Sequence, residues 1–223
     1  MRTLVIIPSF NEAKEIAQLV TKVKQQGLDV LVIDDGSIDD TVHLAQNAGA
    51  IVLRNLKNHG KGASLIRGFN YAVENNFDAV ITMDGDGQHL PEDIPYFLRL
   101  AQNSDTGIFI GNRMHKPKNM PGGRFLTNKI MSSLISGIAG QKIPDTQCGF
   151  RLLKKETLRK LNLVTTNYEI ESEMLIKAAR LRFKIESVPI SSVYSGGKSQ
   201  INPFLDTLRF IKYICKELWT TKS

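Results

Sequence analysis

Cysteine is scarce in this chain of 223 residues, and its two cysteines, Cys148 and Cys215, lie far apart. Two distant cysteines form neither a disulfide framework nor a metal-binding C-x-x-C pattern, so cross-linking is excluded as the source of stability. Low cysteine use is typical of proteins in a reducing compartment, and we expect a cytoplasmic location. A chain of this length can bury a hydrophobic core without cross-links.

Long hydrophobic runs are also lacking. The first apolar run covers only Leu4–Ile7, which is too short for the core of a signal peptide. No stretch approaches the roughly 18 to 20 apolar residues that cross a bilayer as a helix. We therefore expect a protein that is soluble or bound peripherally at the inner face of a membrane.

Acidic residues are absent between Asp105 and Asp145, although the whole chain has 22 of them. The same window contains these basic residues: Arg113, Lys116, Lys118, Arg124, Lys129 and Lys142. A long basic stretch without carboxylates favours an anionic partner: a phosphate group, an acidic membrane surface or a nucleic acid. The sequence has no signature of an RNA- or DNA-binding module, and only Phe109 and Phe125 interleave the basic window. We therefore expect no nucleic-acid partner.

Short apolar runs alternate with helical patterns through the first half of the chain. The predicted strands are Leu4–Ile7, Val30–Ile33, Ile51–Leu53, Ala79–Met83 and Gly107–Ile110. The predicted helices are Glu12–Gln26, Thr41–Asn47, Lys61–Asn75 and Pro91–Gln102. Strands that are apolar on both faces are typical of a parallel sheet covered by helices. The alternation predicts an α/β fold with a doubly wound, mostly parallel sheet and ligands at the carboxyl ends of its strands.

The pattern changes after the fifth predicted strand. A basic loop over 113–123 is followed by predicted helices Phe125–Ala139, Tyr168–Leu181 and Phe204–Trp219 and a strand Lys184–Val188. No linker or repeat divides the chain. We expect a single domain over 1–223, with a nucleotide-binding half over about 1–110 and an acceptor-binding half over about 111–223.

Paired carboxylates follow two of the predicted strands. Asp84 and Asp86 come directly after the fourth strand, and Gln88 and His89 add an amide oxygen and a ring nitrogen nearby. Oxygen donors at i and i+2 of an extended segment point to one side and suit a hard divalent cation. An ordinary acidic turn is the competing interpretation of these residues.

Three further clusters follow strands or begin helices. Asp34 and Asp35 follow the second strand, where carboxylates can accept hydrogen bonds from a base or a ribose. Phe10 and Glu12 follow the first strand, where the glycine fingerprint of a dinucleotide-binding fold is missing, so a nicotinamide enzyme is disfavoured. Lys61 lies between two glycines at a helix start and suits a phosphate, although the spacing is not that of a P-loop.

These clusters occur in a fixed order along the chain. The ordered segments are Pro8 to Glu12, Asp34 to Ser37, Asn58 to Gly62, Asp84 to His89, Gly111 to Arg113, Asp145 to Arg151, Tyr168 to Glu173 and Gly197 to Ser199. The series resembles family 2 glycosyltransferases, in particular the branch similar to dolichyl-phosphate mannose synthases. The resemblance covers about residues 3 to 210 and implies a GT-A fold.

The resemblance also implies roles for individual residues. Pro8, Phe10, Glu12 and one of Asp34 or Asp35 would contact the nucleoside, while Lys61 and Lys198 would contact the donor phosphates. Asp84, Asp86 and Gln88 would hold Mg²⁺ or Mn²⁺ with the donor diphosphate, where the ion stabilises the departing nucleoside diphosphate. Arg113, Arg124 and Asn128 would bind the acceptor phosphate.

The activity implied is transfer of a sugar, with inversion, from a nucleotide sugar of the GDP-mannose or UDP-glucose type to a polyprenyl or dolichyl phosphate. An ionised phosphate needs no general base. A soluble family 2 enzyme acting on a saccharide or another hydroxyl acceptor is the alternative, and it would need a base such as Asp145, Glu171 or Glu173. A nucleotidyltransferase also needs paired carboxylates. Neither the donor base nor the oligomeric state follows from the sequence.

Overall fold

In the computed structural model, which describes residues 1–115, 120–191, 209–210 and 212–215, one sheet runs through both halves of the chain. Its seven strands have the order β3-β2-β1-β4-β6-β5-β7. The strands are β1 (Thr3–Ser9), β2 (Asp29–Asp34), β3 (Ile51–Arg54), β4 (Ala79–Thr82), β5 (Ile108–Asn112), β6 (Arg151–Lys154) and β7 (Ile185–Pro189). The mostly parallel sheet predicted from the apolar runs is confirmed.

Helices occupy most of the remaining described chain. They are α1 (Ile16–Lys24), α2 (Thr41–Asn47), α3 (Lys61–Glu74), α4 (Ile94–Gln102), α5 (Gly122–Ala139), α6 (Lys155–Lys160) and α7 (Ile170–Arg180), with short 3₁₀ turns η1 (Pro91–Asp93) and η2 (Arg113–His115). The predicted helix over Phe204–Trp219 lies largely outside the described residues, of which 209–210 and 212–215 are helical. Among the described residues, no helix is both long and apolar enough to cross a membrane.

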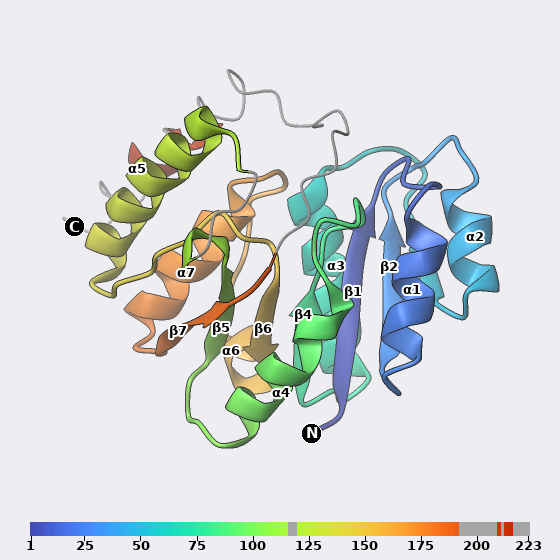
Figure 1. The fold of residues 1–223 in the computed structure, drawn as a ribbon, viewed down its shortest axis with the longest axis horizontal. Helices are drawn as coiled ribbons and strands as arrows, with labels where there is room; N and C mark the ends of the chain where they lie inside the picture. The colour runs from blue at the N-terminus through green and yellow to red at the C-terminus, as the bar shows by residue number, and fades with distance from the viewer. Residues whose placement is uncertain (116–119, 192–208, 211, 216–223) are drawn as a thin grey trace.

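Helices cover both faces of the sheet. In Figure 1, α1 and α4 lie in front of it and α3 lies behind. Gln26 Nε2 donates a hydrogen bond to the carbonyl of Pro91 at 2.8 Å, which joins the end of α1 to the turn before α4. On the other face α3 approaches β1 closely, because a Cβ added at Gly68 would lie 2.7 Å from Ile6 Cγ2. Because helices cover both faces, the central strands are buried on both sides, which explains their continuous apolar sequences.

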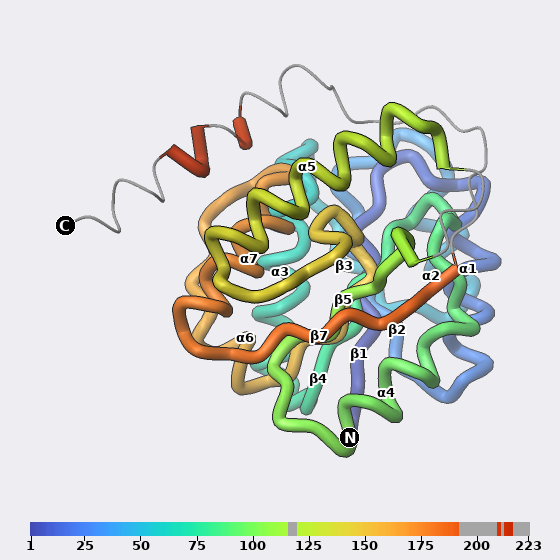
Figure 2. The backbone as a smooth tube through the Cα atoms, turned by 60° about the vertical axis from the view of Figure 1, so that its left-hand side comes forward, coloured from blue at the N-terminus to red at the C-terminus, as the bar shows by residue number. Residues whose placement is uncertain are grey.

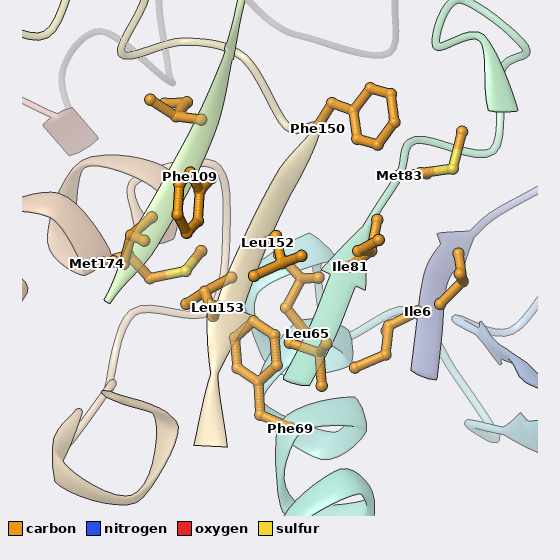
Figure 3. Packing of buried hydrophobic residues seen from close by; sticks show 14 of the residues in the cluster. Ile6, Leu65, Phe69, Ile81, Met83, Phe109, Phe150, Leu152, Leu153 and Met174 are labelled. Atoms are coloured by element: carbon orange, nitrogen blue, oxygen red, sulfur yellow. The ribbon is translucent and has the colours of Figure 1, made fainter. Parts of the chain in front are cut away.

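The hydrophobic core fills the space between the sheet and these helices. Leu65 and Phe69 of α3 lie on the face of the sheet that carries Ile6 of β1 and Leu153 of β6, whereas Ile81 of β4 points to the opposite face (Figure 3). Each of these five side chains is at least 95% buried. The core crosses from the first half of the chain into β6, so it packs the two halves against each other.

Three elements differ from the sequence prediction: β6, the short helix α6 that follows it and was not predicted, and the start of α1. The segment β6, which is only four residues long, was not predicted, and it pairs antiparallel with both β4 and β5. Helix α1 begins at Ile16 and not at Glu12, because the preceding turn is fixed to the next loop. There the Glu12 N–H donates to Thr41 Oγ1 at 2.8 Å, and the Ala13 N–H donates to Asp39 Oδ2 at 3.1 Å.

The direction of β6 determines what meets at the edge of the sheet. The carboxyl ends of the parallel strands β1, β2, β4 and β5 lie at one edge. Because β6 runs the opposite way, its amino end lies at this same edge, together with the preceding residues 145–150. Sequence segments that are far apart in the chain therefore meet around the end of β4.

Candidate functional site

The turn after β4 is closed by hydrogen bonds from its own residues. The main-chain N–H of Asp84 donates to His89 Nδ1 at 3.1 Å. The N–H of Gln88 donates to Asp86 Oδ1 at 3.1 Å, and Gln88 Nε2 donates to Asp86 Oδ2 at 2.6 Å. Gln88 therefore orients Asp86, and both carboxylates are held on one short turn.

The two carboxylates of this turn have opposite pKa shifts. Burial and the charge of Asp84 raise the pKa of Asp86. Burial also acts to raise the pKa of Asp84, but the ammonium of Lys61 and other nearby cations outweigh it and hold that pKa well below its usual range. The pair therefore concentrates negative charge at the edge of the sheet, where a cation is favoured.

His89 supports the turn as a neutral ring. Burial lowers the pKa of His89 to about 4, against the opposing charge of Asp84. Its Nδ1 accepts the main-chain hydrogen bond described above, while Nε2 lies 3.8 Å from Asp84 Oδ2 and 4.0 Å from Cys148 Sγ. The ring packs against Phe150, with centroids 5.3 Å apart. Both ring nitrogens thus face the turn and its immediate neighbours.

Gly149 leaves space for the carboxylate of Asp84. A Cβ added at Gly149 would lie 2.8 Å from both carboxylate oxygens of Asp84. The carbonyl of Gly149 also accepts a hydrogen bond from Thr82 Oγ1 at 2.6 Å. Residue 149 therefore needs to be glycine for this carboxylate to occupy its position.

Lys61, at the first position of α3, reaches the same carboxylate. Its Nζ lies 2.6 Å from Asp84 Oδ1 and 2.6 Å from Glu171 Oε1. Burial works against its charge, but Asp84 and Glu171 outweigh burial and raise the pKa of Lys61. The ring of Tyr168 lies 5.7 Å from the ammonium. Lys61, expected to meet a phosphate, thus pairs with carboxylates from two distant segments.

The glycines on each side of Lys61 are needed for close packing of the backbone. A Cβ at Gly60 would lie 2.4 Å from the carbonyl oxygen of Thr166, and one at Gly62 would lie 2.4 Å from that of Thr165. The N–H of Ala63 donates to the Thr166 carbonyl at 3.1 Å. These contacts, made inside the protein, account for both glycines.

Asp34 and Asp35 differ in their partners. Asp34 is fully buried, accepts from the Ser37 N–H at 3.2 Å and lies 3.4 Å from Arg54 Nε, while its Oδ1 has no partner among the described residues. Asp35 Oδ1 accepts from Asn55 Nδ2 at 2.7 Å and from the main chain of residue 59 at 2.9 Å. Asp35 Oδ2 accepts one hydrogen bond from the part of the chain that the structure describes, from the main chain of residue 60 at 2.8 Å, and a carboxylate oxygen has capacity for another.

The segment after β1 lies beside these aspartates. Pro8 and Phe10 are half-buried, and the N–H of Asn11 donates to Ser37 Oγ at 2.8 Å. Burial, together with the charges of Asp86 and Asp84, raises the pKa of Glu12 to about 7. The structure therefore brings Glu12 from the first predicted cluster close to the carboxylates after β4.

Arg113 and Asp145 form a buried, two-pronged ion pair. Arg113 Nε donates to Asp145 Oδ2 at 2.8 Å, and Arg113 Nη2 donates to Oδ1 at 2.9 Å. The N–H of Arg113 also donates to Oδ2, at 3.0 Å. Asp145 is fully buried and Arg113 is 6% exposed. Paired donors in a fork fix the plane of the carboxylate as well as its charge.

Helix α5 carries the other residues predicted to bind an acceptor phosphate. Arg124, in its first turn, is half-buried and is one of the cations that act on the pKa of Asp86, after burial and the charge of Asp84. Asn128, one turn later, is 6% exposed, and its Nδ2 is buried without a partner among the described residues. A buried N–H group without an acceptor is costly and marks a position for one.

The remaining charged residues near the site have structural contacts. Arg151 is fully buried and donates to the carbonyls of Cys148, Thr146 and Glu171 at 2.7 to 2.9 Å. Glu173 accepts from the N–H groups of residues 164 and 165 and from Lys177 Nζ at 2.6 Å. Despite burial, these contacts lower the pKa of Glu173. Arg151 and Glu173 therefore hold loops in place.

The donor set at this turn fits a hard divalent ion. No group of three or more histidine, cysteine or acidic side chains that could hold a metal is present among the described residues. An ion here would have Asp84, Asp86 and the Gln88 amide oxygen as ligands, with phosphate and water completing its shell, as is usual for Mg²⁺. The ammonium that contacts Asp84 indicates that the position accepts positive charge. Lys198 lies outside the described residues, and its role stays a prediction.

Sequence reasoning missed three features of this site. Gly149 lies in the segment Asp145 to Arg151 that the sequence analysis singled out, but its contact with Asp84 arises only from the antiparallel direction of β6. The loop over 165–167 was not identified, because its polar residues carry no signal of the backbone contacts with Gly60 and Gly62. The polar pairing of Lys61 with Glu171, 110 residues away, also has no local signal.

Known proteins resemble this chain in sequence and in fold. Residues 4–161 match the family described as "Glycosyl transferase family 2". The UDP-N-acetylglucosamine–dolichyl-phosphate N-acetylglucosaminyltransferase of Methanococcus voltae is 30% identical over 85% of this chain and 85% of its own length. The undecaprenyl-phosphate mannosyltransferase of Micrococcus luteus is 30% identical over 86% of this chain and 84% of its own.

A solved structure confirms the predicted GT-A fold. Glucosyl-3-phosphoglycerate synthase from Mycobacterium tuberculosis, crystallised with Mn²⁺, uridine diphosphate and phosphoglyceric acid, superimposes with a TM-score of 0.74. The match covers 98% of this chain and 77% of the synthase, at 20% sequence identity. At this identity the likeness concerns the fold.

Proposed function

Because the chain belongs to glycosyltransferase family 2, we propose that it transfers a sugar from a nucleotide sugar to a polyprenyl-type lipid phosphate. The names of the two relatives above support this acceptor class. The donor would be of the GDP-mannose or UDP-glucose type. In the transfer, an oxygen of the lipid phosphate bonds to the anomeric carbon as the bond from that carbon to the nucleoside diphosphate breaks. A single displacement of this kind inverts the anomeric centre.

One observation carries the choice of a phosphate acceptor. Each carboxylate that was a candidate base is already engaged: Asp145 by Arg113, Glu171 by Lys61, and Glu173 by Lys177 and a loop. A carboxylate paired with a cation is a poor proton acceptor. A hydroxyl acceptor needs such a base, whereas a lipid phosphate is already ionised at neutral pH. The site therefore suits the phosphate.

The proposal assigns roles to the residues described above. Phe10, Glu12 and Asp35 would bind the nucleoside, with the second lone pair of Asp35 Oδ2 accepting a donor N–H or hydroxyl. Asp84, Asp86 and Gln88 would hold Mg²⁺ or Mn²⁺, which supplies positive charge to the departing diphosphate. Arg113, Arg124 and the unpartnered Nδ2 of Asn128 would orient the acceptor phosphate.

The test is a transfer assay on the full chain. The protein is incubated with Mn²⁺ or Mg²⁺, a panel of nucleotide sugars, and undecaprenyl or dolichyl phosphate in mild detergent. We expect release of a nucleoside diphosphate and formation of a new glycolipid, both dependent on the lipid. Release only with water-soluble hydroxyl acceptors would contradict the lipid-phosphate proposal, and pyrophosphate release would indicate nucleotidyl transfer.

A further inference from the structure

The ammonium of Lys61 lies between two carboxylates, and the three residues come from three different segments of the chain. Asp84 follows β4, Glu171 lies in the first turn of α7, and Lys61 begins α3. Its Nζ is 2.6 Å from an oxygen of each carboxylate, and the lysine side chain is 16% exposed. One of its partners is a candidate metal ligand, so a lysine cation contacts the carboxylate that the metal would use.

The backbone at Lys61 cannot move away easily. Gly60 and Gly62 pack directly against the carbonyls of the loop over 165–167, and Asp35 accepts the N–H of Gly60 at 2.8 Å. That loop is fixed in turn by Glu173, which accepts from the N–H and the hydroxyl of Thr165 at 2.9 and 2.6 Å. Only the four-carbon side chain of Lys61 is left to change position.

We propose that Lys61 competes with the divalent ion for Asp84, so that metal enters only when a diphosphate gives the lysine a new anionic partner. An ammonium within 3 Å of a carboxylate neutralises it and repels a second cation. A donor diphosphate offers Lys61 oxygens of comparable charge. Metal and donor are therefore expected to bind cooperatively, and metal alone is expected to bind weakly. This inference rests on the proposed function, because it takes the donor to be a nucleotide sugar.

The first measurement is Mn²⁺ binding to the full chain without nucleotide, followed by the electron paramagnetic resonance signal of free Mn²⁺. Lys61→Met removes the charge, keeps the apolar stem and leaves Asp84 and Glu171 facing each other. We expect this variant to bind Mn²⁺ at least about tenfold more tightly than the unmodified protein, given the strength of a unit charge at such short range. Lys61→Arg retains the charge and should bind Mn²⁺ as weakly as the unmodified chain.

The matched control is Lys24→Met, which changes net charge equally. Lys24 lies at the end of α1, pairs weakly with Asp29 at 3.9 Å and is distant from the turn after β4. Its Mn²⁺ affinity should not change. Lys61→Gln is made in parallel, because an amide can still hydrogen-bond to both carboxylates if methionine prevents folding. Thermal unfolding of each variant verifies that the compared proteins are folded.

The second measurement is calorimetry of UDP and GDP binding, with and without Mn²⁺. For the nucleotide that binds, Mn²⁺ should increase affinity in the unmodified protein by a larger factor than in Lys61→Met, since coupling between two ligands is reciprocal. Equal Mn²⁺ affinities for the unmodified and Lys61→Met proteins would overturn the inference and leave the proposed transfer standing. Absence of Mn²⁺ binding by all variants, even with nucleotide, would overturn both the competition by Lys61 and the metal-assisted transfer proposed above.

Discussion

Arg113 and Asp145 form a bidentate ion pair, in which two nitrogens of the guanidinium donate to the two oxygens of the buried carboxylate at 2.8 and 2.9 Å. The pair joins the end of β5 to the segment before β6, and both segments lie at the edge of the sheet that carries the site. This ion pair stabilises the fold and also positions the guanidinium that we propose binds the acceptor phosphate, and mutation can separate the two effects.

Asp145→Asn should destabilise the protein, because it removes the carboxylate charge that the buried guanidinium of Arg113 meets at 2.8 and 2.9 Å. Removal of one partner of a buried pair costs about 3 to 5 kcal/mol, measured as the loss in the free energy of unfolding in urea. The double change Arg113→Met with Asp145→Leu should recover much of this stability while lipid-dependent transfer stays low. Full activity in the double variant would remove Arg113 from the acceptor site.

Asp86→Ala should abolish most of the transfer with little effect on folding. Among the described residues, the hydrogen bonds of its carboxylate come from Gln88, within the same turn. Loss of one preorganised electrostatic group lowers turnover by about 100-fold or more, measured as nucleoside diphosphate release. Asp29→Ala, at the amino end of β2 and therefore at the opposite edge of the sheet, is the matched control and should retain activity.

Gly149→Ala should reduce transfer because the new methyl group would occupy the position of the Asp84 carboxylate. The added carbon would lie 2.8 Å from both oxygens, so Asp84 must shift. We expect at least about a tenfold loss of activity and a destabilisation of about 1 to 3 kcal/mol. Gly137→Ala in α5, where a Cβ meets none of the described residues within 4 Å, is the control and should leave activity unchanged. Equal activity of both variants would show that Asp84 tolerates displacement.

The raised pKa of Glu12 predicts how stability depends on pH. Burial and the charges of Asp86 and Asp84 raise this pKa from 4.5 to about 7, so the folded protein binds the proton more tightly than the unfolded chain. The stabilisation is complete below pH 4.5 and is lost as pH rises to about 7. Urea unfolding between pH 4.5 and 8 should show a shallower decline for Glu12→Gln. Glu74→Gln, exposed at the end of α3, should follow the unmodified protein.

Helix α5 presents an apolar stripe that suits the surface of a membrane. Leu126, Ile130 and Leu134, spaced one turn apart, are 58%, 59% and 44% exposed. Figure 2 shows α5 along the outside of the molecule, beyond α7. Conversion of all three to serine should weaken cosedimentation with anionic lipid vesicles by about tenfold or more, because burial of aliphatic side chains drives such binding. Serine at the exposed Ile38, Leu56 and Val164, which lie outside α5, is the control and should have no effect.

The parts of the fold that the sequence predicts are those with a strong local pattern. The strands around Ile6, Val32 and Ile81 are continuous apolar runs, because helices cover both faces of the sheet. β6 was missed because it has only two apolar residues, Leu152 and Leu153, between two basic residues, whereas the equally short β3 and β4 each contain three consecutive apolar residues. The first turn of α1 was wrongly included because tertiary hydrogen bonds to Thr41 and Asp39 override a helical pattern.

In the candidate site, too, the residues with a local sequence signal were predicted and the contacts that depend on tertiary packing were not. Asp84, Asp86 and Glu12 were candidates because each carboxylate directly follows a predicted strand, and the structure places all three near one another at the carboxyl ends of the parallel strands. The partners of Lys61 could not be predicted, because they depend on how the loop over 165–167 packs against two glycines. The side chain of Arg151 ends on main-chain carbonyls, which no residue pattern specifies.

The antiparallel strand β6 also determines when the sheet can be completed during synthesis. β6 lies between β4 and β5, yet it is made after both. Until residues 151–154 leave the ribosome, β4 and β5 each expose an unpaired edge, and exposed edges favour association with other chains. The nascent chain therefore passes through an interval of aggregation risk that ends when β6 inserts. A ribosome stalled shortly before residue 151 should hold a chain that requires a chaperone.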